Sequence, residues 1–476
     1  MNRAKLVTTA LAALTLAGFV GSAPKADGQP FCHPPIAGAV AEAGTGQQAA
    51  GGSTQPAADY IRFDGSHIVV ELFPEHAALL KDPQRWVEQL DAVYETLADL
   101  VGGVPFGGQK ITIQEAPPMP YIALSGNPIQ WNTDYVPSGI STLNDGGLGT
   151  GIFHEISHDF DLAGWAYVTQ LPAADAEHWA NFKELYALHR LAPLYPEAWY
   201  GSEPVPLSKF GEAYFVESFA EPYLSAGSRD WRTMPHDVFT GLFYLEAQEI
   251  GWEPFKEAFR DYLAGRFDQG AVTTDEGKIS EFIRLLSKNA GQDLSPQFRE
   301  WGFPTPTVVI ASLRAGWNHS CYVRGEKTVQ DGLADIASGV QAVYHLTAEQ
   351  RFDRWFMGRP DLSTIATLSS YEPLLVLSSE ASTWAQLATG TPPTTVNLAQ
   401  GWNTVCYTGQ QKTMADATAG IAGKFGILYM LTESQSWARY VPGSSPDSSD
   451  IAELKTYDSV LVLVTEPGGT QWVFDP

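Results

Sequence analysis

Hydrophobic and polar residues follow two different spacings along the first two-thirds of the chain. Segments in which the two kinds alternate predict strands, and these lie at residues 67–74, 110–115 and 121–132. From Asp82 to Val101 the apolar residues recur every three or four positions, which predicts a helix that Gly102 and Gly103 stop. Helical spacing then dominates from about residue 173 to residue 300. A small mixed sheet followed by a helical subdomain predicts an α+β domain over residues 59–305.

The last third of the chain contains an internal repeat. The segment LRAGWNHSCY begins at Leu313, and LAQGWNTVCY begins at Leu398, 85 positions later. Further pairs at the same offset are Ile336 with Ile421, Tyr344 with Tyr429 and Arg354 with Arg439. In each copy the pattern predicts a strand, a helix, a strand, an irregular segment and two strands. We therefore predict two tandem α+β repeat modules, at residues 306–391 and 392–476.

Cysteine and tryptophan residues occupy equivalent positions in the two copies. Cys321 corresponds to Cys406, and packing of the copies side by side would bring the two within disulfide reach. The alternative is a pair of buried free thiols in duplicated cores, which we favour. The repeat tryptophans could stack on sugar rings, although duplicated positions belong more often to a core. These tryptophans are Trp317, Trp402, Trp384 and Trp472.

The first 58 residues predict export. Residues 1–23 combine Arg3 and Lys5 with an apolar run and small residues at the end, which is typical of a secretory signal peptide. Residues 24–58 are rich in Gly, Ala, Gln and Pro and predict a disordered linker. The rest of the chain has no run of 18 apolar residues, so we predict no membrane span. We expect a secreted monomer, either extracellular or associated with a cell surface.

The formal net charge of −25 limits the classes of partner. Nucleic-acid binding requires a basic face, so we predict no nucleic-acid partner. The same charge disfavours docking on anionic lipid. Charged residues make up only 17% of the chain, so the acidity reflects a small number of Lys and Arg residues. Its ordinary consequence is solubility outside the cell.

The segment GIFHEISHDFD, residues 151–161, carries the chemistry. His154, Glu155 and His158 have the spacing H-E-x-x-H, and residues four apart share one face of a helix. The two imidazoles can therefore bind one metal ion. Zinc suits such ligands, in a tetrahedral site with one position open for water. Glu155 would accept a proton from that water. The alternative is a surface helix that carries two unrelated histidines.

Five segments of residues 60–304 resemble the enhancin-like mucinases, the peptidase M-sixty family of zinc metallopeptidases. They are GNPIQW, GIFHEISHDFD, AEHWANFKELYAL, YLEAQEIGWEPFKEAFRDYL and ISEFIRLLSKNAGQDLSPQFREWGFP. The resemblance implies a gluzincin, which holds zinc through two His and one Glu and cleaves glycoproteins, often O-glycosylated mucins. Members of the family frequently carry sugar-binding or surface modules. The chain departs from the family at Ser157 and Asp159, where Gly and Asn are usual, and neither position is a metal ligand.

Two glutamates compete for the place of third metal ligand. Glu177 lies 19 residues after His158 and opens the AEHWANFKELYAL helix, where the resemblance places the ligand. The residues that fit the family register are Asn181, Leu185 and Tyr186. Glu217 lies 59 residues after His158, in a segment that resembles the E-x-F-A-E-x-F of lethal-factor-type zinc peptidases. Glu184 lies about 10 Å from Glu177 along one helix, so both cannot reach the metal.

The strand predicted at residues 121–132 directly precedes the metal helix. In many zinc peptidases such a strand lies along the cleft, and its free edge pairs with an extended substrate. An ordinary edge strand would have the same sequence pattern. Both interpretations stay open.

Together these features predict a secreted zinc-dependent endopeptidase that acts on mucin-like glycoproteins. Glu155 would serve as general base on the metal-bound water and then as proton donor to the leaving amine. The candidates for stabilising the oxyanion are Tyr186, His189 and Tyr214. One alternative is a lethal-factor-type peptidase that uses Glu217. Another is a non-catalytic, carbohydrate- or surface-binding adhesin, against which the intact Glu155 argues. We expect the C-terminal repeats to bind a carbohydrate or cell-surface ligand.

Overall fold

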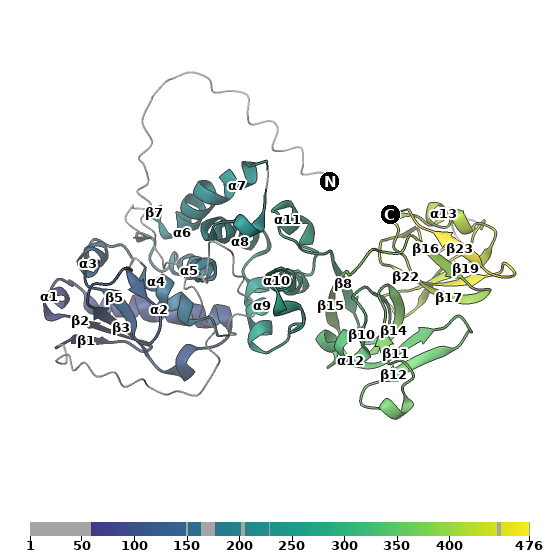
Figure 1. Cartoon of the computed structure of the whole chain (residues 1–476), viewed down its shortest axis with the longest axis horizontal. Helices are drawn as coiled ribbons and strands as arrows, with labels where there is room; N and C mark the ends of the chain where they lie inside the picture. Colours follow the sequence, from purple (N-terminus) through teal and green to yellow (C-terminus); the bar gives the residue numbers. More distant parts are fainter. Residues whose placement is uncertain are drawn as a thin grey trace, which may run out of the picture.

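A computed structural model describes most of the chain downstream of residue 58. The described residues are 59–148, 151–162, 177–200, 205–227, 229–444 and 449–475, so the predicted signal and linker lie outside them. Helices and several small sheets alternate within these ranges, which confirms the α+β class. A sheet lies at one end of the long axis in Figure 1, helices lie in the middle, and two β-rich units lie at the other end. None of the described helices combines the length and apolar character needed to cross a membrane.

A mixed five-stranded sheet forms the N-terminal end of the molecule. Its strands, in spatial order, are β1 (Ile61–Asp64), β2 (Ile68–Leu72), β3 (Ile111–Ala116), β5 (Ile129–Asn132) and β4 (Ala123–Leu124). The three central strands are parallel, and the two edge strands are antiparallel to their neighbours. The segment predicted as one strand at residues 121–132 forms two, because Gly126, with a φ of 124°, turns the chain between them. Of the two edge strands, β1 and β4, the short strand β4 is the one closer in sequence to the predicted metal helix.

Helix α2 (Pro83–Val101) packs against this sheet and against the helices of the site. It begins where the side chain of Asp82 accepts a hydrogen bond from the backbone N–H of Arg85, and it ends at Gly102, whose φ is 80°. The carboxylate of Asp91 accepts hydrogen bonds from three consecutive backbone N–H groups, which fastens the helix to the turn before β2. These belong to Ser66, His67 and Ile68.

The middle of the molecule is helical. Its elements are α1 (Pro74–Ala77), α3 (Val136–Asn144), α4 (Ile152–Asp159), α5 (Glu177–Leu191), β6 (Trp199–Tyr200), β7 (Val205–Pro206), α6 (Leu207–Phe210), a π-helix (Gly211–Ala220), α7 (Glu221–Ser225), α8 (His236–Ile250), α9 (Glu253–Leu263), α10 (Asp275–Ala290) and α11 (Ser295–Glu300). Helix α5 lies against α2, α4 and α8. Its buried Trp179 contacts the rings of Phe239, Phe259 and Phe282, one each from α8, α9 and α10. This aromatic core holds α5 in place.

Two β-rich units with the same strand order follow. Unit 1 contains β8 (Val308–Leu313), β9 (Gly316–Tyr322), β10 (Lys327–Thr328), α12 (Val329–Gly332), β11 (Val340–Leu346), β12 (Phe352–Phe356), β13 (Thr367–Leu368), β14 (Glu372–Ser378) and β15 (Ser382–Leu387). Unit 2 contains β16 (Thr395–Leu398), β17 (Gly401–Cys406), β18 (Lys412–Thr413), α13 (Met414–Ala417), β19 (Phe425–Leu431), β20 (Trp437–Tyr440), β21 (Glu453–Leu454), β22 (Ser459–Val464) and β23 (Thr470–Val473). Their four-stranded sheets have the orders β12-β11-β14-β9 and β20-β19-β22-β17.

A disulfide joins the two units. Cys321 at the end of β9 pairs with Cys406 at the end of β17, with the two Cα atoms 5.4 Å apart. Our preference for two free thiols is therefore wrong, because the two strands contact each other's sheets and bring the equivalent cysteines together. Trp384 and Trp472 are fully buried, as expected for duplicated core positions, whereas Trp317 is exposed.

Unit 1 is also packed against the helical part. Val308 of β8 and Ala385 of β15 belong to the same hydrophobic cluster as the residues of α10. The buried guanidinium of Arg284 on α10 donates hydrogen bonds to the carboxylate of Asp335 and to the backbone carbonyl of Ala385. Glu281 accepts two further hydrogen bonds from the same guanidinium. These contacts fix unit 1 relative to the helices, while the boundary at residue 305 stays a prediction.

Candidate metal centre

The segment that carries H-E-x-x-H forms helix α4, as predicted. The chain enters this helix through Gly151, whose φ of 78° is a conformation that favours glycine. Ile152, Phe153 and Ile156 are buried, so the helix is anchored in the core through its apolar side chains. His154 and His158 lie one turn apart, and both turn their Nε2 atoms toward the start of α5.

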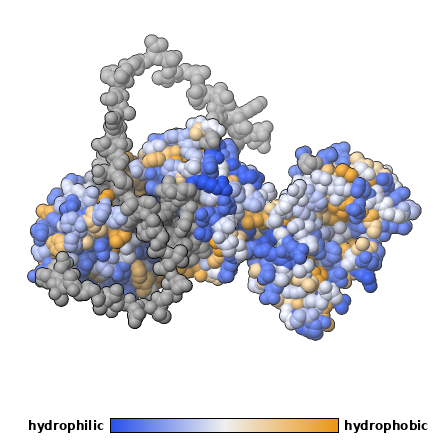
Figure 2. Space-filling model, in the orientation of Figure 1, coloured by the Kyte–Doolittle hydropathy of each residue, from blue (hydrophilic) through white to orange (hydrophobic). Residues whose placement is uncertain are grey.

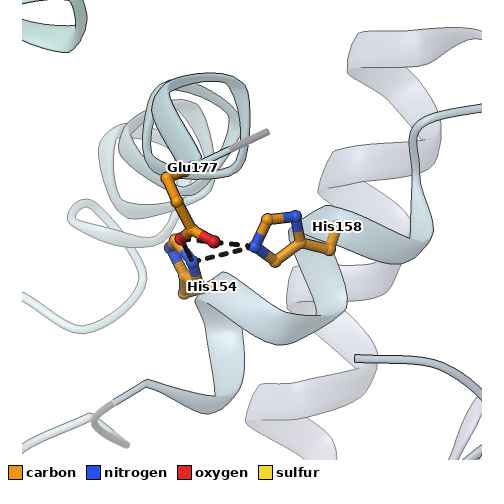
Figure 3. Close-up of side chains that lie close together, drawn as sticks. All are labelled: His154, His158 and Glu177. Atoms are coloured by element: carbon orange, nitrogen blue, oxygen red, sulfur yellow. Dashed lines mark hydrogen bonds and ion pairs between the residues drawn. The ribbon is translucent and has the colours of Figure 1, made fainter. Parts of the chain in front are cut away.

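Three predicted ligands converge at this point. Figure 3 shows the carboxylate of Glu177 directed at both imidazoles. Its Oε2 lies 2.8 Å from Nε2 of His154 and 3.5 Å from Nε2 of His158, and the two Nε2 atoms are 3.0 Å apart. Among the residues that the structure describes, these three make up the group able to hold a metal ion.

The geometry and the donor set fit zinc. Ligand atoms bound tetrahedrally at about 2.0–2.1 Å lie about 3.3 Å from one another, and the three separations fall around that value. Two imidazoles and one carboxylate are ligands that zinc prefers, and a set of three leaves one position open. The residues present therefore fit a zinc ion held by His154, His158 and Glu177.

Burial and charge both act on Glu177. Its side chain is almost completely buried, and burial alone would raise the pKa of its carboxyl. The hydrogen bonds and charges of His154 and His158 outweigh this effect, so the pKa lies far below its ordinary value. Glu177 is therefore an anion, as a metal ligand must be.

Glu155 directly follows His154 on α4. Its side chain is buried, and its Oε2 accepts no hydrogen bond from any residue that the structure describes. A buried carboxylate oxygen normally has a partner, so this oxygen is available to a proton carried by another molecule. Such an oxygen next to a metal site can act as a general base.

A buried ion pair holds α4 and α5 together. The ammonium group of Lys183, which is fully buried on α5, donates a hydrogen bond to the carboxylate of Asp161, just after α4. Burial lowers the pKa of Lys183, while the carboxylates of Asp161 and Asp159 act in the opposite direction. The pair therefore connects the helix of His158 to the helix of Glu177.

We expect the substitution Lys183→Met to lower the free energy of unfolding by about 3 kcal/mol, because breaking a buried ion pair costs roughly 3–5 kcal/mol. Zinc affinity should fall as well, since α4 and α5 lose a direct connection. Denaturant unfolding and zinc titration measure both effects. The control is Lys412→Met, which removes an ion pair with the exposed Asp475 and should cost no more than about 1 kcal/mol. Equal losses in the two variants would contradict the positioning role of Lys183.

Glu184 is not among the metal-binding group and instead connects α5 to the start of α4. Its buried carboxyl accepts a hydrogen bond from the hydroxyl of Tyr200, which in turn accepts one from the backbone N–H of Gly151 at 3.4 Å. The chain of contacts joins α5 to the residue at which α4 begins. Glu184 thus orients the two helices and is not part of the ligand group.

The structure separates the other sequence candidates from the metal group. Glu217 is exposed on the π-helix. The hydroxyl of Tyr186 donates a hydrogen bond to Asp99 of α2, and the ring of His189 lies beside Trp252. Tyr214 stacks on Phe210 at the surface. The contacts described for these four residues are therefore with residues other than the three ligands.

Sequence reasoning did not single out the pair His236 and Asp237 at the start of α8. Nε2 of His236 lies 3.4 Å from Oδ1 of Asp237. Burial raises the pKa of Asp237, and the charges of His236 and His154 act in the opposite direction. One turn later Thr240 donates a hydrogen bond to the carbonyl of His178, next to Glu177. The pair thus lies near the metal group, but only the packing of α8 on α5 places it there.

Asp159, where the resembled family has Asn, accepts a hydrogen bond from the backbone N–H of Gly126 at 2.8 Å. Burial raises the pKa of Asp159 to about 8. A protonated carboxyl combines a donor group with an acceptor group, as an amide side chain does, so the difference from Asn is chemically small.

Comparison with known proteins gives distant relatives. No family model matches the chain. It is 26% identical to TRPM8 channel-associated factor 2 of Mus musculus over 194 residues, which cover 40% of this chain and 19% of that protein. It is 23% identical to TRPM8 channel-associated factor 3 of Rattus norvegicus over 263 residues, or 52% of this chain and 26% of that protein. The chain thus spans about a fifth to a quarter of the length of these relatives.

Among solved structures, the chain is similar to a functionally unknown conserved protein from Bacillus anthracis str. Ames. A mutant of that protein matches with a TM-score of 0.41 and 19% identity, over 52% of this chain and 50% of that chain. The function of this chain is therefore inferred from its own residues.

Proposed function

We propose that this protein is a zinc-dependent endopeptidase of the gluzincin type, similar to the enhancin-like mucinases, that cleaves extracellular mucin-like glycoproteins. The observation that carries the proposal is the convergence of His154, His158 and Glu177 beside Glu155. Three donors lie within reach of one ion, and Glu155, which directly follows His154 in the chain, has a carboxylate oxygen without a described partner. A purely structural site has no use for that carboxylate.

The chemistry follows from what each side chain can do. A zinc ion held by the three ligands would supply Lewis-acid polarisation of a carbonyl oxygen and of a water molecule. Glu155 accepts the proton of the attacking water through its Oε2 and later donates it to the leaving amine. Lys183 and Glu184 keep α4 and α5 in register, so that His158 and Glu177 stay at their short separation. Because Glu155 is buried, the dielectric constant around it is lower than in water. Interactions between its charge and neighbouring charges are therefore stronger.

The remaining parts of the chain fit export and attachment. We propose that residues 1–23 are a secretory signal, residues 24–58 a linker, and residues 306–391 and 392–476 two tandem repeat modules. The same strand order in units 1 and 2 supports duplication. The disulfide between the units supports an oxidising compartment. Modules of this kind would retain the enzyme on a glycosylated substrate.

Two alternatives have weaker support. A lethal-factor-type site would need Glu217 as a ligand, and that residue is exposed on the π-helix. A non-catalytic adhesin would not need the buried Glu155 oxygen beside the ligands.

We expect the purified protein to cleave native mucin, and to cleave it less after the mucin has been deglycosylated. A chelator should abolish cleavage, and added zinc should restore it. Gel electrophoresis of the substrate and mass spectrometry of new termini measure the result. Zinc-loaded protein that binds mucin without producing new termini would contradict the peptidase and support an adhesin.

A further inference from the structure

A cleft lies where units 1 and 2 meet. It has a volume of about 440 Å³, which is within the range of small-ligand sites. The residues that line it are Trp317, Tyr344, Phe352 and Leu375 of unit 1 with Leu431, Gln435 and Trp437 of unit 2. Neither unit alone could form it. On the face shown in Figure 2, patches of hydrophobic residues lie at the surface of these C-terminal units.

Aromatic rings form a duplicated row in this region. In unit 1, Tyr344 contacts Trp317 and Phe352, with ring centroids 5.5 and 6.3 Å apart. In unit 2, at an offset of 85 residues, Tyr429 contacts Trp402 and Trp437, at 5.9 and 6.3 Å. Each row therefore has three rings in sequence, and the two rows belong to units joined by a disulfide.

Three of the four rings that line the cleft are exposed, in contrast to the tryptophans of the cores. Trp317 is 40% exposed, Phe352 50% and Trp437 41%, whereas Trp384 and Trp472 are fully buried. Exposure of these apolar ring surfaces to water costs free energy. Core packing does not explain why the three rings are aromatic, because they are not buried in a core. A ligand that covers them would remove that cost.

The cleft is held in one shape before any ligand binds. The side chain of Gln435 accepts a hydrogen bond from the backbone N–H of Trp317 at 2.6 Å and donates one to its carbonyl at 3.0 Å. Gln350 makes the same two bonds with Trp402, at 2.7 and 2.8 Å. The disulfide adds a covalent link between β9 and β17. Because the walls are already fixed, binding would order few groups.

Charge decides which class of ligand fits. The seven described residues that line the cleft are all uncharged, and the chain as a whole carries −25. A nucleic acid or a sulfated polymer would be repelled and would find no cation in the lining. Sugar rings without charge present polarised C–H groups on their faces, and these groups are attracted to the negative face of an aromatic ring.

We propose that this cleft binds a neutral oligosaccharide, namely the uncharged O-linked glycan chains of a glycoprotein. Successive sugar rings would stack on Trp317, Phe352 and Trp437. The choice of glycoprotein glycans rests on the proposed function, whereas the cleft and its uncharged aromatic lining do not. Since unit 1 is fixed to α10 through Arg284, a glycan in the cleft would keep its protein within reach of the catalytic part.

Calorimetric titration of the full chain with neutral O-glycans, released from mucin and treated with sialidase, tests the proposal. We expect saturable binding that Trp317→Ala and Trp437→Ala each weaken by about tenfold. Trp317→Phe keeps an aromatic face and should lose less than Trp317→Ala. The matched control is Phe106→Ala, which removes a ring that is also 40% exposed but lies outside the cleft, and it should bind as wild type. Thermal unfolding of each variant identifies any that do not fold.

Three results would overturn the proposal. The first is no saturable binding of neutral glycans by the wild-type chain. The second is equal binding by wild type and by folded Trp317→Ala and Trp437→Ala variants. The third is tighter binding of sialylated glycans or of a proline-rich peptide. Because the titration does not depend on proteolysis, a chain that binds glycans without cleaving mucin would contradict only the peptidase proposal.

Discussion

The substitution Glu155→Gln is expected to abolish proteolysis while the zinc content of the protein stays unchanged. The amide has the size and shape of the carboxylate, so α4 and the two imidazoles keep their places. It cannot accept the proton of the attacking water, and a positioned general base is typically worth 10²–10⁴-fold in rate. The measurement is the initial rate of mucin cleavage by the variant at the zinc occupancy of the wild type.

A matched control for this variant is Glu246→Gln. Glu246 is also buried, and its Oε2 has no partner among the residues that the structure describes. It lies ten residues along α8 from His236, about 15 Å by the helical rise. Burial raises the pKa of Glu246 to about 7, so a neutral amide suits its surroundings, and cleavage should continue at the wild-type rate. A Glu155→Gln variant within tenfold of wild type would exclude Glu155 as the base.

The substitution Glu177→Ala should reduce zinc affinity by more than about 100-fold. Even a residue that only orients a metal ligand is worth 10–100-fold in affinity, and Glu177 supplies a ligand atom. Its loss would leave the Nε2 atoms of His154 and His158, 3.0 Å apart, as the two remaining donors. Zinc content after dialysis against a weak chelator, measured by elemental analysis, reports the change.

Glu217→Ala is the control for the third ligand, because Glu217 is the other glutamate that the sequence pattern offers as a ligand. Its exposed position on the π-helix predicts wild-type zinc content. Retention of zinc in Glu177→Ala together with its loss in Glu217→Ala would reverse the assignment and support a lethal-factor-like site. Loss in both variants would indicate a general effect on folding, which the thermal unfolding of each variant would reveal.

Local features of this chain are determined by the sequence itself. The spacing of His154 and His158 places both on one helical face, whatever surrounds the helix. The cap at Asp82 and the left-handed Gly102 delimit α2 in the same way, since these interactions involve residues only a few positions apart. The strand and helix periods, and the 85-residue repeat, also depend on short segments or on direct comparison of them. These parts of the prediction needed no knowledge of packing.

Contacts between distant segments required the tertiary structure. The choice of Glu177 over Glu217 depends on which helix packs across α4, and the sequence allows either. The disulfide and the exposure of Trp317 likewise depend on how the two similar units face each other. Equivalent positions of a repeat look alike in sequence, so the sequence does not tell which of them the neighbouring unit covers. Lys183 and His236 carry no local signal at all. Their roles come from partners on other elements, and the free energy of burying the apolar faces of α5 and α8 decides which partners those are.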